Sequence, residues 1–109
     1  AHGSIQNGSF VIANTGWTKF WNDPRKFIGL DENKVRHFPG WGHEAAQYLH
    51  EKGVRGLGGD TASIDPGNST TFDAHRVFLK ADKYLVENIK LDEENSRALP
   101  EAGGTILIM

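Results

Sequence analysis

The sequence contains no cysteine, no long apolar run and no cluster of basic residues. The absence of cysteine excludes disulfides and cysteine-based zinc sites. No apolar run approaches the ~20 residues of a transmembrane helix, so we expect no membrane partner. The 12 Lys and Arg residues are balanced by 14 Asp and Glu residues, and the net charge is −2. Because surfaces that bind nucleic acids are strongly basic, we expect no nucleic-acid partner either.

The length of 109 residues leaves room for one domain, and no linker, repeat or low-complexity tract divides the chain. We therefore treat residues 1–109 as a single domain. No signal-peptide pattern opens the chain, although two glycosylation sequons occur, at Asn7 and at Asn68. Because such short motifs often arise by chance, the sequence favours a cytoplasmic location over secretion.

The most informative stretch runs from Gly58 to Asn88. A short buried strand is predicted just before it, at Val54 to Leu57, and a second strand near its end, at Tyr84 to Val86. With a helix between them, the two strands are expected to be parallel and joined by a right-handed crossover. Both strands then end at the same edge of the sheet, where open α/β sheets bind ligands. This edge would bring together two acids that follow the strands, Asp60 and Glu87.

The helix between these strands is predicted over residues 71–81. Asp65 to Asn68 form a turn signal, with proline presetting φ at the second position and glycine accepting a positive φ at the third. Thr70 and Asp73 match the spacing of a capping box, which marks a helix N-terminus. His75 falls in the second turn, on a side shared with phenylalanine and leucine residues.

His75 and Glu87 each allow a structural and a functional interpretation. A histidine among phenylalanine and leucine side chains is more often a hydrogen-bonded core residue than a ligand. A carboxylate that ends a buried strand is harder to explain in this way, since burying an unpaired charge costs several kcal/mol. Glu87 therefore needs a metal, a cation or several hydrogen-bond donors, and the two residues together favour a site.

Several motifs, taken together and in order, resemble the cyclase family of metal-dependent hydrolases. They are the run GGDTASIDPGNSTTFDAH, the later YLVEN, and the upstream elements Asn14-Thr15-Gly16-Trp17 and Phe38-Pro39-Gly40. This family includes bacterial-type kynurenine formamidases and isatin hydrolases. The resemblance implies an α/β fold: a cyclase-like (swivelling β/β/α) domain with a mixed sheet and flanking helices, here incomplete at both ends.

The resemblance also implies a metal centre, often of two divalent ions, Zn²⁺ or Mn²⁺, that activates water against a cyclic amide or an N-formyl group. His75 matches the family's late metal-binding histidine and Glu87 its late carboxylate ligand, with the family's separation of twelve residues. Asp60 and Thr61 match a motif beside the site and are expected to be supporting structure. The implied partners are a small-molecule substrate and further copies of the chain in a homo-oligomer.

The chain departs from the family by lacking its principal metal motif, His-x-Gly-Thr-His-x-Asp, and the catalytic histidine downstream of it. We therefore expect these residues to be the C-terminal portion of a longer protein, whose N-terminal half, or a partner chain, completes the metal site. A last strand is predicted at Thr105 to Met109. No catalytic residue is assigned within the chain, and the 109 residues alone should be inactive, because zinc sites take at least three protein ligands.

Four aromatic residues are candidates for substrate binding: Trp17, Trp21, Phe38 and Trp41. Trp17 and Trp21 belong to a cluster that follows a predicted strand at residues 10–13, and most aromatics in such clusters are core residues. Phe38 and Trp41 lie in an irregular loop with proline and glycine, of a kind that often borders a pocket.

Two further helices are predicted outside the central stretch. Asp23 and Pro24 provide an N-cap and a first-turn proline for a short helix, with Leu30 among its buried residues. The other helix covers residues 42–52, and its apolar stripe would consist of Ala45, Ala46, Tyr48 and Leu49.

The main alternative to an enzyme is a non-catalytic cyclase-like module with a binding or structural role. The presence of both His75 and Glu87 argues against it, since a decayed site has no reason to keep a buried acid. A carbohydrate-binding module, suggested by the tryptophans alone, would have no metal.

Overall fold

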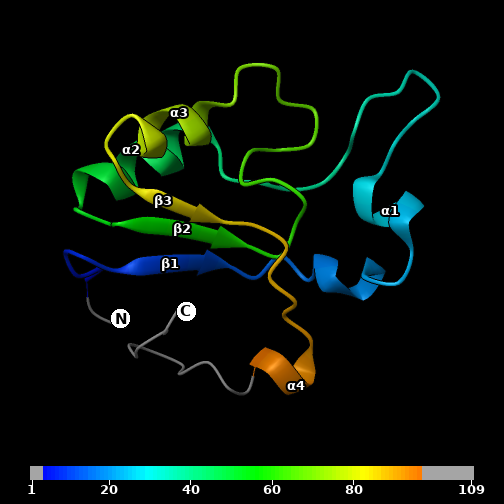
Figure 1. Cartoon of the computed structure of the whole chain (residues 1–109), viewed down its shortest axis with the longest axis horizontal. Coiled ribbons are helices and arrows are strands. Elements are labelled where there is room, and N and C mark those ends of the chain that lie inside the picture. The colour runs from blue at the N-terminus through cyan, green and yellow to red at the C-terminus, as the bar shows by residue number, and fades with distance from the viewer. Residues whose placement is uncertain (1–3, 97–109) are drawn as a thin grey trace.

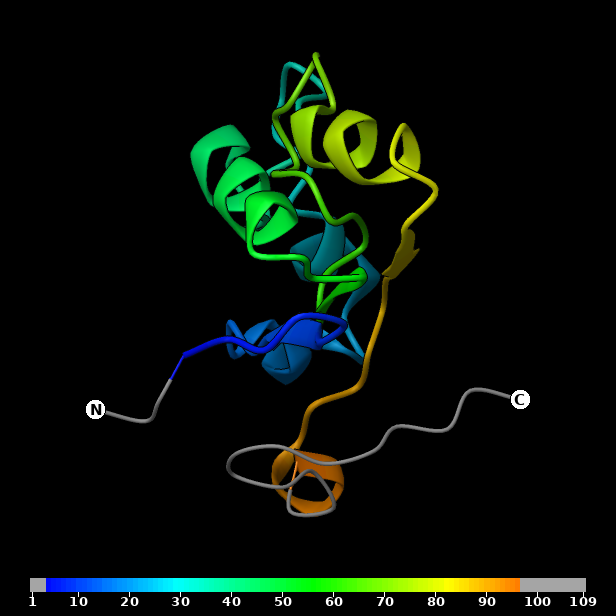
Figure 2. The same cartoon turned by 90° about the vertical axis from the view of Figure 1, so that its left-hand side faces the viewer.

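The computed structural model describes residues 4–96 and contains a three-stranded parallel sheet in the order β1-β2-β3. The strands are β1 (Phe10–Ala13), β2 (Gly56–Gly59) and β3 (Tyr84–Val86). Helices α2 (His43–Glu51) and α3 (Asp73–Leu79) pack side by side over one face of the sheet (Figure 1, Figure 2). The remaining elements are short: η1 (Trp17–Phe20), α1 (Pro24–Ile28) and α4 (Glu93–Ser96). Within residues 4–96, none of the helices has the length and apolar character to span a bilayer.

This architecture confirms the predicted α/β class, and β1 and β3 have the predicted bounds. The central strand differs, because β2 spans residues 56–59 whereas the prediction was Val54 to Leu57. It continues through Gly58 and Gly59, which pair with the end of β1. Glycine is depleted in strands, so propensity favours an earlier end. The strand predicted at Thr105 to Met109 lies outside the described residues.

A row of three residues in register crosses the sheet: Phe10 of β1, Gly56 of β2 and Tyr84 of β3. The rings of Phe10 and Tyr84 stack with their centroids 5.5 Å apart. They can approach because residue 56 has no side chain: a Cβ there would lie 2.4 Å from the Tyr84 ring. Since side chains alternate along a strand, Leu57 points to the opposite face and is fully buried in the core.

The core lies between the sheet and helices α2 and α3. Its buried residues come from both layers and from the connections between them: Ala46, Leu49, Val54, Leu57, Ile64, Ala74 and Phe78. The apolar stripe of α2 is narrower than predicted, because Tyr48 is 54% exposed and the buried residues of this helix are Ala46 and Leu49. Leu30 was predicted to be buried but is 55% exposed, since it lies beyond the end of α1.

Helix α3 begins at Asp73, two residues later than predicted, and the predicted capping box is wrong. Phe72 precedes the helix in the left-handed conformation, with φ 52°, and its side chain makes no capping hydrogen bond. The backbone N–H groups of Ala74 and His75 are bound by the distant Asp65 carboxylate instead. Asp65, which a turn separates from the helix, therefore caps α3 in place of Thr70, the residue that the sequence pattern predicts.

The turn before α3 lies one residue later than predicted. It is closed by a hydrogen bond of 2.9 Å from the N–H of Ser69 to the carbonyl of Pro66, and Gly67 does not have the expected positive φ. The N–H of Gly67 donates to the Phe38 carbonyl at 2.9 Å. The loop before α2 therefore packs directly on the segment that contains Asp65.

Gly40, in the loop before α2, lies close to the backbone of Asp65. Replacing Gly40 by alanine is expected to destabilise the fold by about 3 kcal/mol. A Cβ at residue 40 would lie 2.4 Å from the backbone carbonyl carbon of Asp65, where no side-chain rotation can relieve the clash. The measurement is urea unfolding of the Gly40→Ala variant.

Gly42→Ala is the matched control for this prediction. A Cβ at Gly42 would meet nothing within 4 Å, and its φ of −73° suits alanine. Because it precedes α2 at the N-cap, we expect a cost of at most about 1 kcal/mol. Equal stability losses in the two variants would show that the contact with Asp65 is not tight.

Candidate metal site

The structure brings His75 and Glu87 together. His75 lies in α3, and Glu87 directly follows β3, at the edge of the sheet where β2 also ends. The Nε2 atom of His75 lies 3.1 Å from Oε1 of Glu87. Both side chains keep contact with solvent, with 28% and 33% of their surfaces exposed. The same Glu87 oxygen accepts a hydrogen bond of 3.2 Å from the N–H of Ile64, so its position is held from a second side.

Asp65 contacts the other side of the His75 ring. Its Oδ2 atom lies 2.5 Å from Nδ1 of His75 and also accepts the backbone N–H of His75 at 3.1 Å. Its Oδ1 atom accepts the N–H of Ala74 at 2.7 Å, and the residue is 1% exposed. From the sequence, Asp65 is assigned only to a turn. The Ser-x-Asp element that ends at this residue is the signal that could have identified it.

The three side chains form a line in which an imidazole lies between two carboxylates. Imidazole and carboxylate donors suit Zn²⁺ and Mn²⁺ alike. Because Asp65 occupies Nδ1, the donors that can face a metal ion are Nε2 of His75 and the carboxylate of Glu87. Two protein ligands are fewer than zinc sites use. In the part of the chain described, no group of three or more His, Cys, Asp or Glu side chains is arranged to hold a metal ion. The residues present thus fit part of a metal site.

Asp60 and Thr61 lie beside this edge but bind other parts of the chain. Asp60 is fully buried and accepts three hydrogen bonds: from the N–H of Thr15 at 3.1 Å, from its hydroxyl at 2.7 Å, and from the N–H of Trp17 at 2.9 Å. The carbonyl of Thr61 accepts the N–H of Asn88 at 2.9 Å. Both residues thus connect the ends of neighbouring strands, and their role as supporting structure stays a prediction.

The four aromatic candidates do not share one surface. Trp17 and Phe38 line an open hollow of about 320 Å³, whose other lining residues are His37, Pro39 and Asn68. Trp41 packs against the core, and its ring N–H donates to a carbonyl of β2 at 3.1 Å. Trp21 is 37% exposed and contacts another ring of the α1 region edge-on. Of the four, Trp17 and Phe38 are therefore the two that line the same hollow.

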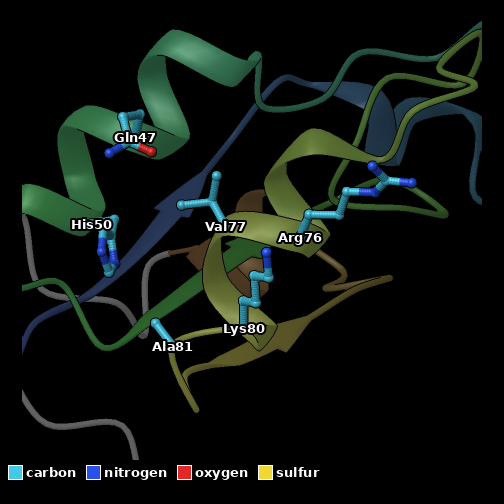
Figure 3. Close-up of a pocket in the computed structure, with 6 residues that line it drawn as sticks. All are labelled: Gln47, His50, Arg76, Val77, Lys80 and Ala81. Atoms are coloured by element: carbon cyan, nitrogen blue, oxygen red, sulfur yellow. The ribbon is translucent and has the colours of Figure 1, made fainter.

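A larger hollow of about 410 Å³ lies between α2 and the α3 region (Figure 3). Its lining contains no carboxylate and consists of Gln47, His50, Arg76, Val77, Lys80 and Ala81. The cationic side chains of Arg76 and Lys80 would repel a metal ion. This hollow is therefore distinct in chemistry from the His75 and Glu87 site.

Comparison with known proteins agrees with the motifs. The model of the Cyclase family, described as "Putative cyclase", matches residues 1–66, and His75 and Glu87 lie beyond this match. The kynurenine formamidase of Bordetella petrii is 41% identical over 56 residues, which cover 51% of this chain and 27% of that protein. The isatin hydrolase of Roseibium aggregatum is 31% identical over 111 residues, which cover 98% of this chain and 40% of that protein.

Solved structures extend the likeness to the fold. Isatin hydrolase A from Ralstonia solanacearum matches with a TM-score of 0.82 and 30% identity, over 94% of this chain and 39% of that one. Isatin hydrolase A from Labrenzia aggregata, bound to benzyl benzoate, matches with a TM-score of 0.79 and 26% identity, over 94% and 39%. The chain thus spans less than half the length of these relatives. The match over residues 1–66 and the shared fold show that the chain belongs to the Cyclase family.

Proposed function

We propose that this chain supplies part of the metal site of an amide hydrolase, which cleaves the C–N bond of a small cyclic amide or an N-formyl aromatic substrate. The observation that carries the proposal is the approach of His75 Nε2 to Glu87 Oε1, at 3.1 Å. It places a nitrogen and an oxygen donor at the edge where parallel sheets bind ligands. The relatives named kynurenine formamidase and isatin hydrolase support an amide as the target.

In this proposal, His75 and Glu87 are ligands of a Zn²⁺ or Mn²⁺ ion. When bound, such an ion polarises a carbonyl group and lowers the pKa of bound water to roughly 7. His75 contributes a neutral imidazole and Glu87 an anionic carboxylate. The remaining ligands come from polypeptide outside these 109 residues, either an N-terminal segment of the same protein or a partner chain. The homo-oligomer and the cytoplasmic location stay predictions.

The hollow beside Trp17 and Phe38 provides a surface for the aromatic ring of the substrate. Aromatic pairs contribute about 0.5–1.5 kcal/mol beyond their buried area, which favours a flat ring in this place. The N–H of Gly67, two residues after Asp65, donates a hydrogen bond to the carbonyl of Phe38. The segment from Asp65 to Gly67 therefore contacts both Phe38, on the proposed substrate surface, and His75, a proposed metal ligand. Substrate binding by Trp21 and Trp41 stays a prediction.

The test measures metal content and amide hydrolysis for the protein at its full natural length, with N-formylkynurenine and isatin as the two substrate classes. We expect turnover of at least one of them to be lost when a chelator removes the metal and to return when Zn²⁺ or Mn²⁺ is added. The reason is that polarisation of the amide carbonyl depends on the ion. The 109-residue chain alone is expected to show no turnover.

Two outcomes would contradict the proposal. Full turnover by protein that elemental analysis shows to be free of metal would exclude the metal-dependent mechanism. A full-length protein that neither binds metal nor hydrolyses either amide would favour the non-catalytic cyclase-like module.

A further inference from the structure

We propose that Asp65 is a positioning residue that fixes the ring orientation and the tautomer of His75. The inference rests on the proposed function, because its importance follows from His75 being a metal ligand. Histidine ligands commonly donate their second ring N–H to a carboxylate or a carbonyl, which fixes the ring in place. Here the candidate for that partner is a buried carboxylate on a different segment of the chain.

Asp65 holds His75 at two points. One oxygen, Oδ2, accepts the backbone N–H of His75 at 3.1 Å and lies 2.5 Å from the ring Nδ1. The other oxygen accepts the N–H of Ala74 at 2.7 Å. Because the same carboxylate binds the backbone and the ring, rotation of the imidazole about its side-chain bonds would break a short hydrogen bond to a charged group.

The chemistry of Asp65 determines which ring nitrogen carries the proton. The side chain is 2% exposed, and a buried carboxylate needs hydrogen-bond donors to offset the loss of water. An ionised carboxylate can only accept, and a neutral imidazole has one N–H donor and one acceptor nitrogen. Both ring nitrogens lie near a carboxylate, but Asp65 is nearer to its nitrogen than Glu87, at 2.5 Å against 3.1 Å, and is far more buried. We therefore assign the hydrogen of the neutral ring to Nδ1, which makes Nε2, beside Glu87, the nitrogen that can bind a metal ion.

The segment that carries Asp65 is itself held by the loop before α2. The N–H of Trp41 donates to the Ile64 carbonyl at 2.7 Å, and the N–H of Gly67 donates to the Phe38 carbonyl at 2.9 Å. These bonds flank Asp65 on both sides in the sequence. The backbone that carries the Asp65 carboxylate is thus held in place, as a residue that positions the proposed metal ligand His75 requires.

The test is the Asp65→Asn variant of the full-length protein, compared with the wild type by NMR and by metal binding. Asparagine has nearly the same volume, and its oxygen can still accept the N–H of Ala74. In that orientation its NH₂ group replaces Oδ2, so the backbone N–H of His75 loses its acceptor. Nδ1 must then accept from the amide, which moves the ring hydrogen to Nε2. In metal-free protein, at a pH where the ring is neutral, ¹⁵N NMR should show Nδ1–H in the wild type and Nε2–H in the variant.

The metal measurement uses Zn²⁺ alone, titrated in competition with a chelator. Loss of the supporting carboxylate is expected to lower Zn²⁺ affinity by roughly 10–100-fold. Asp73→Asn is the matched control: it changes the same residue type in the first turn of the same helix, and it should leave the tautomer and the affinity as in the wild type.

Three results separate this inference from the proposed function. An Nε2–H tautomer in the wild type would overturn the role of Asp65 without any variant, and so would an unchanged tautomer and affinity in Asp65→Asn. If the wild type binds no Zn²⁺, the proposed function fails. The tautomer in metal-free protein would still show whether Asp65 orients His75.

Discussion

Replacing His75 by alanine is expected to lower kcat/KM for amide hydrolysis by the full-length protein by more than about 100-fold. Loss of a group that merely supports a ligand costs roughly 10–100-fold, and loss of the ligand itself should exceed that range. Glu87→Gln is expected to act in the same direction, because the neutral amide removes the negative charge that the ion requires. The measurements are steady-state kinetics and metal content by elemental analysis.

His43→Ala is the control for this prediction. His43 is an exposed histidine at the start of α2, on another helix, and its loss should leave both metal content and turnover near the wild-type values. A His75→Ala protein that retains its full metal content and activity would remove His75 from the proposed ligand set. Loss of both properties in His43→Ala as well would point to a general effect of histidine removal on folding.

Replacing Asp60 by alanine is expected to lower the free energy of unfolding by about 3–5 kcal/mol, because three hydrogen bonds to a charged group are lost. The carboxylate is fully buried and accepts three hydrogen bonds from Thr15 and Trp17, so its removal leaves partly buried donors without their acceptor. Each such group costs about 1–3 kcal/mol. Since domains are typically stable by only about 5–15 kcal/mol, this loss is a large fraction of the total stability. Urea unfolding provides the measurement.

Asp23→Ala is the comparison for Asp60. Asp23 caps α1 by accepting the N–H of Lys26 at 3.1 Å, and its side chain is 44% exposed. Removal of such a cap costs typically about 1 kcal/mol. If Asp60→Ala cost no more than this, the three hydrogen bonds to its carboxylate would not be a main source of stability. Metal content per folded molecule should be unchanged in both variants, because neither side chain is a proposed ligand.

The approach of His75 to Glu87 was predicted in two steps. The strand at Tyr84 to Val86 has a clear sequence pattern, and a parallel crossover places Glu87 at the edge where β2 also ends. The pairing of Glu87 with His75 came from the resemblance to the cyclase family. The functional role of the pair stays a prediction. The positions of the two residues could be predicted because the strand before Glu87 and the helix that contains His75 are short segments with strong secondary-structure preferences.

The contacts that could not be predicted are those between residues far apart in the sequence. Asp60 was considered for the site, and its hydrogen bond to Thr15, 45 residues away, depends on the register of β1 on β2. The role of Asp65 was missed for a similar reason, since its partners lie nine and ten residues later across an irregular turn. Capping patterns describe only the three or four residues at a helix start. They therefore place the N-cap of this helix at Thr70 and not at Phe72.

The two aromatic rings over Gly56 can stack only when β1 and β3 flank β2 in the observed register. A slip of β3 by one residue would turn all its side chains to the opposite face of the sheet. Glu87, three residues beyond Tyr84 and thus about 10 Å along the strand, would then point away from His75. Aromatic stacking at the beginning of the sheet thereby determines whether the acid and the imidazole meet at its end.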